Sequence, residues 1–248
     1  MTAPVYLVSP ALATAWQPGE QVLLDGAEGR HAATVRRTSP GEVVVIADGE
    51  GSWGRGEVVA VDKASVTILL ASTGHDAVPP VRLVLVQALA KGGRDDQAIE
   101  AATELGVDEV IPWQAERSIV QWRGARAEKA RESWRALLRS AAKQSRRTRV
   151  PALGPTVTTR ALAARLAGAS AAYVLHEDAD QPLASQSFPE AGEVLVVVGP
   201  EGGITPTELS VLESVGARPM RLGPHVLTSS SAGPAALAVL CARLRWQA

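Results

Sequence analysis

The clearest indication of the fold is the segment Val194-Leu195-Val196-Val197-Val198-Gly199-Pro200-Glu201-Gly202-Gly203. Its first half is a continuous apolar run, which is typical of a strand buried on both faces of a parallel sheet. Its second half is a glycine-rich turn, and Thr205-Pro206 then supplies a helix N-cap and a first helical position. Ligands of open α/β sheets bind at the carboxyl ends of strands, where glycines let backbone N–H groups come close. We expect the turn to bind a ligand, because helix capping needs neither Gly202 and Gly203 together nor Glu201 before them.

The sequence around this stretch predicts strands that alternate with helices from residue 78 to residue 248. A nearly continuous apolar run at 81–89 predicts a second buried strand, and the linker Asp76–Pro80 precedes it. Strands that alternate with helices imply a mostly parallel α/β sheet. The other expected strands are 107–113, 171–175 and 219–222, and the expected helices are 95–105, 125–146, 207–215 and 233–245.

The first part of the chain instead holds short runs rich in β-branched residues, which Gly, Asp and Pro separate. This spacing predicts a small β-barrel with one short helix near residues 31–37. We therefore expect two domains, at residues 1–74 and 78–248. The expected barrel strands are 21–24, 42–47, 56–61 and 65–70.

A glycine motif in the first domain matches the dinucleotide-binding fingerprint GxGxxG at Gly49, Gly51 and Gly54. That fingerprint needs a strand before it and a helix after it. Another run typical of a strand, Gly56–Val61, follows the motif here. We therefore expect a hairpin loop at this position and no dinucleotide site.

Two other polar loops are expected at the same edge of the sheet as the glycine-rich turn. His176 and Glu177 follow an apolar strand, and the loop 221–232 precedes the last helix. Taken singly, His176 fits a structural histidine equally well, and Ser230 or Ser231 fits a helix cap. Three such loops from neighbouring strands would wall one pocket, which no single motif explains.

Positive charge is concentrated in one segment of a chain whose net charge is −1. Residues 117–149 hold eleven Arg or Lys and only two acids, Glu128 and Glu132, so the local balance is +9. Phosphate contacts supply most non-specific affinity for nucleic acids, so we expect this segment to bind RNA. Trp122 and Trp134 lie within it and could stack on bases, although Trp134 suits a core position better. The alternative is an ordinary solvated basic face.

Several classes of protein are disfavoured. Cys241 is the only cysteine, so no intramolecular disulfide can form, and a cytoplasmic location is expected. Residues 1–10 lack a signal-peptide pattern. The sequence also has no run of about 20 apolar residues, which is the length needed to span a membrane. The four histidines are scattered and neither HExxH nor CxxC occurs, so we expect no metal site. The absence of GxxxxGK[ST] disfavours a nucleotide-binding α/β enzyme.

Six motifs follow one another along the second domain: Lys91-Gly92-x-Arg94-x-Asp96, Ala102-Thr103-Glu104-Leu105-Gly106, Ile111-Pro112 with Glu116-Arg117-Ser118, Leu175-His176-Glu177, Gly199–Gly203 and Leu222-Gly223-Pro224. Their order resembles the RsmE family, which are SPOUT-class enzymes that methylate N3 of a uridine in 16S ribosomal RNA. The first domain fits that family's PUA-like barrel, so the resemblance covers nearly the whole chain. The fitting motifs are Gly29-Arg30-His31, Val35-Arg36-Arg37, Pro40-Gly41-Glu42 and Asp48-Gly49.

The resemblance implies an N-terminal PUA-like β-barrel and a C-terminal SPOUT domain with a trefoil knot. It implies S-adenosylmethionine as the cofactor, the small ribosomal subunit as the partner, and a homodimer. Glu201 and His176 are the candidate catalytic residues. The implied cofactor-binding residues are Leu175, His176, Glu177, Val198, Gly199, Pro200, Glu201, Gly202, Gly203, Leu222, Gly223, Leu227, Ser229, Ser231 and Ala232. The expected RNA contacts are Arg30, His31, Arg36, Arg37, Lys91, Arg94, Arg117, Arg139, Lys143, Arg146 and Arg147.

The chain departs from the family in its last loop. The family usually reads Leu-Arg-Thr-Glu-Thr-Ala there, or has Ser in place of the Glu, whereas Leu227–Ala232 reads Leu-Thr-Ser-Ser-Ser-Ala. Thr228 thus replaces the arginine and Ser230 the acid. Cofactor binding through backbone groups is expected to survive this change. A role of that arginine in holding RNA or substrate is put in doubt.

The expected chemistry is in-line attack on a sulfonium methyl group, for which the protein mainly supplies proximity and orientation. Uridine N3 carries a proton and the base must leave its stack, so a general base or an oriented water is useful. Glu201 is the candidate base with His176 or Glu177 behind it, and each of the three fits equally a role in holding the cofactor. Two alternatives are another SPOUT methyltransferase, acting on transfer RNA or a ribose 2′-hydroxyl, and a catalytically silent RNA-binding or ribosome-assembly factor.

Overall fold

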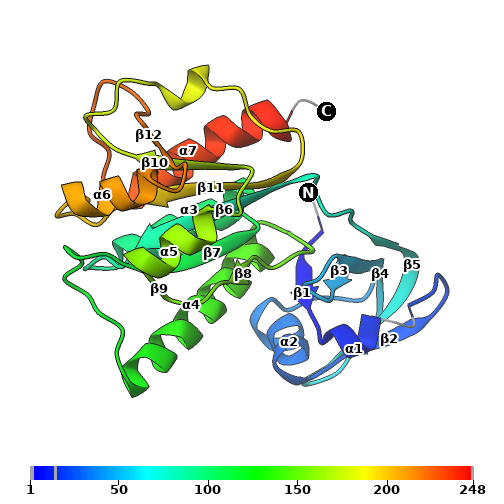
Figure 1. Ribbon diagram of the computed structural model, residues 1–248. Helices are drawn as coiled ribbons and strands as arrows, with labels where there is room; N and C mark the ends of the chain where they lie inside the picture. Colours follow the sequence, from blue (N-terminus) through cyan, green and yellow to red (C-terminus); the bar gives the residue numbers. More distant parts are fainter. Residues whose placement is uncertain (1–2, 14–15, 247–248) are drawn as a thin grey trace. The chain divides into compact units, whose positions relative to one another are not determined.

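The computed structural model describes residues 3–13 and 16–246, which fall into two compact units (Figure 1). The first unit comprises Met1–Val78 together with Ala142–Val150, and the second comprises Pro79–Ala141 and Pro151–Ala248. Residues 142–150 lie in the part of the sequence that we assigned to the second domain. In the structure they pack with the first unit, so a segment from the middle of the chain completes the N-terminal fold.

A curled five-stranded sheet forms the first unit, in the order β1-β3-β4-β5-β2. β1 runs parallel to β3, and the other neighbouring strands are antiparallel. A register shift at Arg55/Gly56 bends the long pair β4–β5, and a Cβ on Gly56 would overlap the Leu69 carbonyl oxygen. Buried apolar side chains such as Val44, Ile46 and Ile68 fill the concave side. The strands are β1 (Val5–Leu7), β2 (Gln21–Leu24), β3 (Val43–Ala47), β4 (Ser52–Val61) and β5 (Val66–His75).

The helical turns of the first unit are short. α1 spans Pro10–Ala13, and α2 spans Gly26–Arg30 and continues into a π-helix at His31–Val35. The sequence predicts a helix near residues 31–37, and the structure places helical turns there, beginning five residues earlier. Ala32 is fully buried while its neighbours His31 and Val35 are exposed, so this segment packs on the sheet by one narrow face.

The GxGxxG motif belongs to the β3–β4 hairpin, as expected, with Gly49 and Gly51 in the turn and Gly54 in β4. Gly51 makes room for Arg149, whose backbone forms an isolated parallel bridge with Gly49. The Arg149 guanidinium donates to the carbonyl oxygens of Glu50 and Asp76 and contacts His75 Nε2 at 2.9 Å. A Cβ on Gly51 would overlap that guanidinium. The motif therefore serves packing within the first unit.

The sheet of the second unit is parallel throughout, as the sequence predicts. Its strand order is β12-β10-β11-β6-β7-β8, and β9 pairs with β7 beside β8. The two apolar stretches become the central neighbours β6 and β11, which pair over their whole length. The strands are β6 (Val81–Ala88), β7 (Glu109–Gln114), β8 (Ala152–Leu153), β9 (Val157–Thr158), β10 (Ala171–Leu175), β11 (Gly192–Val198) and β12 (Arg218–Met220).

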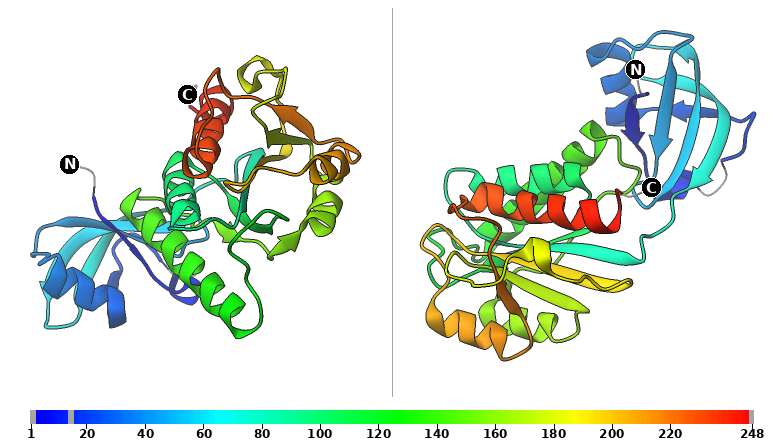
Figure 2. Two further views of the ribbon diagram at one scale, coloured as in Figure 1. Left: turned by 90° about the vertical axis from the view of Figure 1, so that its left-hand side faces the viewer. Right: turned by 90° about the horizontal axis from the view of Figure 1, so that it is seen from above.

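Helices cover both faces of this sheet. Figure 2 shows α3 and α7 on one face and α5 and α6 on the other. α7 lies close to the sheet because Gly233 faces it, where a Cβ would be 2.9 Å from Leu85 Cδ1. The helices are α3 (Arg94–Leu105), α4 (Ala125–Gln144), α5 (Thr159–Leu166), α6 (Pro206–Glu213) and α7 (Ser229–Leu244), and a short 3₁₀ turn spans Leu183–Ser185.

Two helix boundaries test the sequence predictions directly. α3 ends at Leu105 with Gly106 at φ +110°, as expected for a glycine that terminates a helix. The prediction that the last helix begins at Gly233 was wrong, because α7 begins at Ser229 and contains Pro234. Ser230 and Ser231 consequently lie inside the helix, and Thr228 occupies the N-cap position. Among the described residues, no helix combines the length and hydropathy that crossing a membrane requires.

Candidate functional site

The three loops that follow β10, β11 and the short strand β12 meet at one edge of the sheet. β10 pairs in parallel with both other strands, so their carboxyl ends lie side by side. The loops enclose a cavity of about 660 Å³, within the range of roughly 300–1,000 Å³ that small-molecule sites occupy. Its lining consists of Leu175–Asp178, Val198–Ile204, Pro206, Val226–Ser229 and Ala232, with Arg94 from the start of α3 and Arg117 from the loop after β7.

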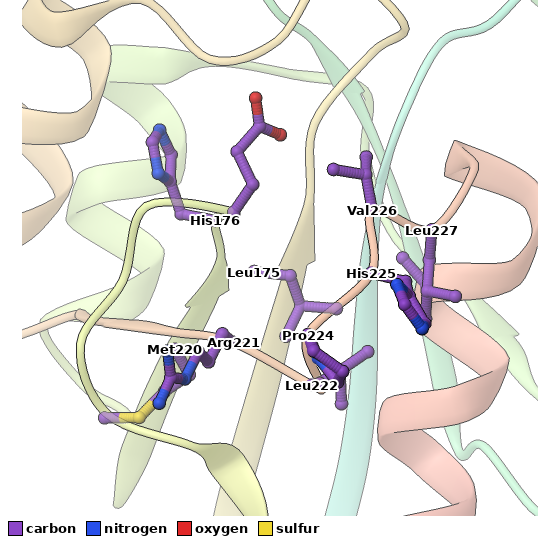
Figure 3. Close-up of a pocket in the computed structure, with 12 residues that line it drawn as sticks. Leu175, His176, Met220, Arg221, Leu222, Pro224, His225, Val226 and Leu227 are labelled. Carbon is purple, nitrogen blue, oxygen red and sulfur yellow. The ribbon is translucent and has the colours of Figure 1, made fainter.

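A smaller hollow of about 110 Å³ adjoins this cavity (Figure 3). Six residues line both hollows: Leu175, His176, Glu177, Val226, Leu227 and Ala232. The smaller hollow is lined as well by the segment Met220–Leu227, which leads from β12 to α7. Leu222 and Gly223 line this hollow and not the larger cavity. In Figure 3 the side chain of Leu175 lies between the loop that carries His176 and the segment that carries Leu222 and Val226.

The structure thus brings together fourteen of the fifteen residues that the sequence assigned to cofactor binding, each lining one of the two hollows. Ser231 is the exception. It is exposed, lines neither hollow, and its hydroxyl accepts a hydrogen bond from Thr228 Oγ1 at 3.1 Å. Four further residues line the hollows and are not predicted from the sequence, although each lies next to a predicted loop: Asp178, Ile204, Pro206 and Met220.

The loop after β10 is fixed to the segment that follows β12. The backbone N–H of His176 donates to Met220 O at 3.0 Å. Further along, Arg221 N–H donates to Gln181 O at 3.0 Å, and Leu183 N–H donates to Arg221 O at 2.9 Å. These backbone bonds hold His176 at the wall that both hollows share, and its Nδ1 accepts from Asp178 N–H at 3.3 Å.

The glycine-rich loop is a tight turn in which Gly203 N–H donates to Pro200 O at 2.9 Å. Gly203 has φ +76°, a conformation that residues with a side chain rarely adopt. A complete capping box follows the turn and starts α6, with Thr205 as N-cap and Pro206 at the first helical position. The predicted cap is therefore confirmed, and the turn enters the helix without a break.

Two arginines that also line the cavity are bonded to this turn. Arg94, at the start of α3, forms an ion pair with Glu201 at 3.0 Å, and the two side chains are 45% and 20% exposed. Arg117, in the loop after β7, donates from Nη1 to Gly202 O at 2.9 Å. From the sequence, both arginines are expected to contact RNA. In the structure both are bonded to the loop that walls the cavity.

A buried carboxylate connects this turn to the loop after β7. Glu208 is 1% exposed, and its Oε1 accepts from Glu116 N–H at 2.9 Å and from Thr159 Oγ1 at 2.8 Å. Its Oε2 accepts from Thr205 N–H at 3.1 Å. Glu208 is not among the residues predicted from the sequence, although the spacing Thr205-x-x-Glu208 is a capping-box signal.

The start of α7 presents hydroxyl groups to the cavity. Ser229 lines it and is 8% exposed, and its Oγ has no hydrogen-bond partner among the described residues. Buried hydroxyls are nearly always hydrogen-bonded, so a ligand's polar group is a suitable partner. Thr228 and Ser230, the two departures from the family pattern, contact each other through their hydroxyls at 2.9 Å.

The basic residues expected to bind RNA differ in how far they are exposed. Arg30, His31, Arg36 and Arg37 are exposed around the π-helix of the first unit. Lys91, Arg139 and Arg146 are exposed as well, and Arg147 is half-buried. Lys143 forms an ion pair with Glu28 at 2.8 Å and is 23% exposed, because it packs within the first unit.

The long helix α4 is less free to bind RNA than its charge predicts. Arg131 donates to Gly154 O at 2.8 Å, and Arg135 forms an ion pair with Glu128 at 2.9 Å. Trp134 is buried, as expected of a core residue, and Trp122 packs edge-on against it with the ring centres 4.9 Å apart. Part of this segment's charge and both of its tryptophans thus serve the fold.

Comparison with known proteins agrees with this geometry. A family described as an RNA methyltransferase domain matches residues 78–241, and one described as an RNA methyltransferase PUA domain matches residues 24–70. Ribosomal RNA small subunit methyltransferase E of Mycobacterium bovis is 44% identical over 237 residues, which cover 93% of this chain and 90% of the relative.

Two solved structures share the fold over 98% of this chain and 98% of their own. A Legionella pneumophila protein solved with bound SAM has 26% identity and a TM-score of 0.83. Ribosomal RNA small subunit methyltransferase E from Neisseria gonorrhoeae, solved with S-adenosylmethionine, has 24% identity and a TM-score of 0.85. The first family covers most of the chain, and the mycobacterial relative is similar along nearly all of it. This chain therefore belongs to the RNA methyltransferase family whose members include ribosomal RNA small subunit methyltransferase E.

Proposed function

We propose that this protein transfers the methyl group of S-adenosylmethionine to N3 of a specific uridine in 16S ribosomal RNA, within the small ribosomal subunit. The observation that carries the proposal is the meeting of the loops after β10, β11 and β12 around one cavity. The names of the relatives and the methyl donor found in the Legionella protein support the same reading.

The cavity fits the methyl donor by its size and by its lining. Three backbone loops supply N–H and carbonyl groups, and Leu175, Val198 and Leu227 supply apolar surface. The unpartnered hydroxyl of Ser229 is available to a polar group of the donor. When bound, S-adenosylmethionine supplies an electrophilic methyl group on a sulfonium. The residues that would hold it are those of the loops Leu175–Asp178, Val198–Ile204 and Val226–Ser229.

The acceptor nitrogen needs a proton removed before it can attack. Glu201 is the residue of this chain that is best placed for that role, because its carboxylate lines the cavity and Arg94 fixes its direction. His176 lines the same cavity from the loop after β10. We propose Glu201 as the group that orients or accepts the N3 proton, with His176 as a second polar group for the uracil ring or the donor.

The first unit is proposed to hold the RNA strand. Its exposed basic side chains, Arg30, His31, Arg36 and Arg37, follow one another around the π-helix. Cationic side chains of this kind bind phosphates without reading sequence, so they would place the RNA and leave the choice of uridine to the cavity. The match to the PUA domain of RNA methyltransferases supports this division of roles.

We also propose a knotted, dimeric form of the second unit. The resemblance to SPOUT enzymes implies the knot, and the backbone bonds of Arg221 to Gln181 and Leu183 hold together two of the loops that would form it. Val226 and Leu227 are 75% and 41% exposed in the last loop, and apolar side chains of this size suit an interface with a second copy. Light scattering of the purified protein is expected to give the mass of two chains.

The experiment that tests the function uses small ribosomal subunits from a strain that lacks the gene. They are incubated with the protein and methyl-labelled S-adenosylmethionine, and the labelled nucleoside is identified by mass spectrometry after digestion of the RNA. We expect 3-methyluridine at one position of 16S RNA. Label on a ribose 2′-hydroxyl, or label in transfer RNA only, would replace this function with that of a different SPOUT enzyme. No binding of the donor in calorimetry would indicate a silent RNA-binding factor.

A further inference from the structure

We propose that Arg117 is a positioning residue of the methyl-donor site, which holds the turn Gly199–Gly203 in its binding shape. This differs from the role that its charge suggests, which is a contact to an RNA phosphate. The inference rests on the proposed function, because it takes the turn as part of the site for S-adenosylmethionine.

The contact between Arg117 and the turn is both polar and steric. Nη1 of Arg117 donates to Gly202 O at 2.9 Å. The two backbones are also packed together, since a Cβ on Gly202 would lie 3.0 Å from Arg117 Cβ. Arg117 therefore fills the space next to Gly202, and both residues line the cavity.

The backbone that carries Arg117 is itself held in place. Its neighbour Glu116 donates its N–H to the buried carboxylate of Glu208 at 2.9 Å. On the other side, Ser118 is 5% exposed and donates its N–H to Ala115 O at 3.1 Å. Glu208 also caps α6, the helix that the glycine-rich turn enters. The Glu208 carboxylate thus holds the backbone immediately before Arg117. It also holds the backbone immediately after the turn that Arg117 contacts.

The two arginines that hold the turn do so differently. Arg94 bonds the side chain of Glu201, which can rotate away without moving the backbone. Arg117 bonds a backbone carbonyl of the turn, so its loss would free the main chain that faces the cavity. Ordering a mobile loop during binding costs conformational entropy and so lowers the affinity. A loop that already has its bound shape does not carry this cost. For this reason Arg117 is expected to affect the affinity for the donor.

The test compares Arg117→Met and Arg117→Lys with Arg160→Met. Arg160 is exposed on α5 and lines neither hollow of the site, so its variant controls for the loss of one positive charge. The affinity for S-adenosylmethionine is measured by calorimetry without RNA. The affinity for 16S RNA is measured by filter binding at several salt concentrations.

We expect Arg117→Met to weaken donor binding about tenfold, which corresponds to roughly 1.4 kcal/mol, and Arg117→Lys to weaken it less. The KM for the donor should rise more than kcat falls, as expected when binding is lost in the ground state. The affinity for RNA and its dependence on salt should match those of Arg160→Met. Melting temperatures equal to that of Arg160→Met would show that the fold is intact.

If Arg117→Met melts lower, Gly202→Ala offers a second route, because the added Cβ crowds Arg117 and should also weaken donor binding. The inference is overturned if Arg117→Met binds the donor as tightly as the wild type. In that case, the slope of log RNA affinity against log salt concentration becomes decisive. A slope that is smaller by about one in Arg117→Met would identify Arg117 as a phosphate contact. A wild-type protein that does not bind the donor would overturn the proposed function itself.

Discussion

The carboxylate of Glu208 accepts a hydrogen bond from the backbone N–H of Glu116 at 2.9 Å, although the two residues are 92 positions apart in the sequence. The same carboxylate completes the capping box of α6 through Thr205. It therefore joins the loop after β7 to the helix that the glycine-rich turn enters. Two walls of the cavity that lie far apart in the sequence depend on this one buried group.

Replacing Glu208 with glutamine should lower the free energy of unfolding. The side-chain amide would face Glu116 N–H or Thr205 N–H with its NH2 group, so that two donors would meet. We expect Glu208→Gln to lower the free energy of unfolding by roughly 1–3 kcal/mol, the usual effect of leaving buried polar groups without partners. Urea unfolding measures it, with Glu213→Gln on the exposed side of the same helix as the control. Equal stability of the two variants would show that the Glu208 network contributes little.

Glu201 can be tested by a variant that keeps its shape. Glu201→Gln still offers an oxygen to Arg94 but cannot accept a proton. We expect turnover to fall by about 10² or more, the usual contribution of a general base, while the affinity for S-adenosylmethionine changes little. Steady-state kinetics together with calorimetry separates the two effects. Similar losses in turnover and in affinity would assign Glu201 to donor binding instead.

Asp95 gives the second unit a measurable pH dependence. Burial raises the pKa of its carboxyl, and the charge of Asp96 adds to this, although N–H groups of Ala90 and Asp96 donate to it. The folded state therefore holds the proton more tightly than the unfolded state. The stability that this contributes is complete below the unfolded pKa and is lost as the pH rises through the raised pKa.

Asp95→Asn cannot ionise, so this loss should disappear. We compare the free energy of unfolding of Asp95→Asn with that of the wild type. The difference, variant minus wild type, should become more positive as the pH rises from acid to neutral. Urea unfolding at a series of pH values measures it, and Glu104→Gln, exposed on the same helix, is the control. Parallel curves for wild type and Asp95→Asn would contradict the shifted pKa.

Gly51, in the hairpin of the first unit, allows the cost of a steric overlap to be separated from the cost of backbone strain. Gly51 has φ +115°, and a Cβ there would also overlap the Arg149 guanidinium. Gly19 has φ +91° with open space around it, so Gly19→Ala measures the strain alone. Strain of this kind costs about 1–3 kcal/mol, and Gly51→Ala should be the more destabilising variant in thermal melting. Equal melting temperatures would mean that Arg149 moves aside freely.

Much of the fold follows from local patterns in the sequence. The strands β6 and β11 are apolar on both faces, and Gly106 and Thr205 mark helix ends by residue type alone. β8 and β9 have two residues each, too few to produce a periodic signal. The predicted start of the last helix, Gly233, is four residues later than the true start of α7 at Ser229. The four intervening residues, Ser229–Ala232, are polar or small, and the pair Gly233-Pro234 disfavours a helix interior.

The candidate site was predicted through a rule of topology, since adjacent parallel strands bring their following loops together. That rule placed the loops at Leu175, Gly199 and Leu222, and the structure joins them. The partners of individual charges were less predictable. Charge density alone cannot show that Arg117 bonds Gly202, or that Arg149 and Lys143 pack within the first unit, because those contacts depend on the tertiary fold.

The three loops are proposed to form a single site for the methyl donor. Hydrogen exchange with and without S-adenosylmethionine can test this, because it reports on each loop separately. We expect slower exchange in residues 175–178, 199–204 and 222–232 together, with β4 and β5 of the first unit unchanged. Protection of only one of these loops, or protection confined to the first unit, would contradict it.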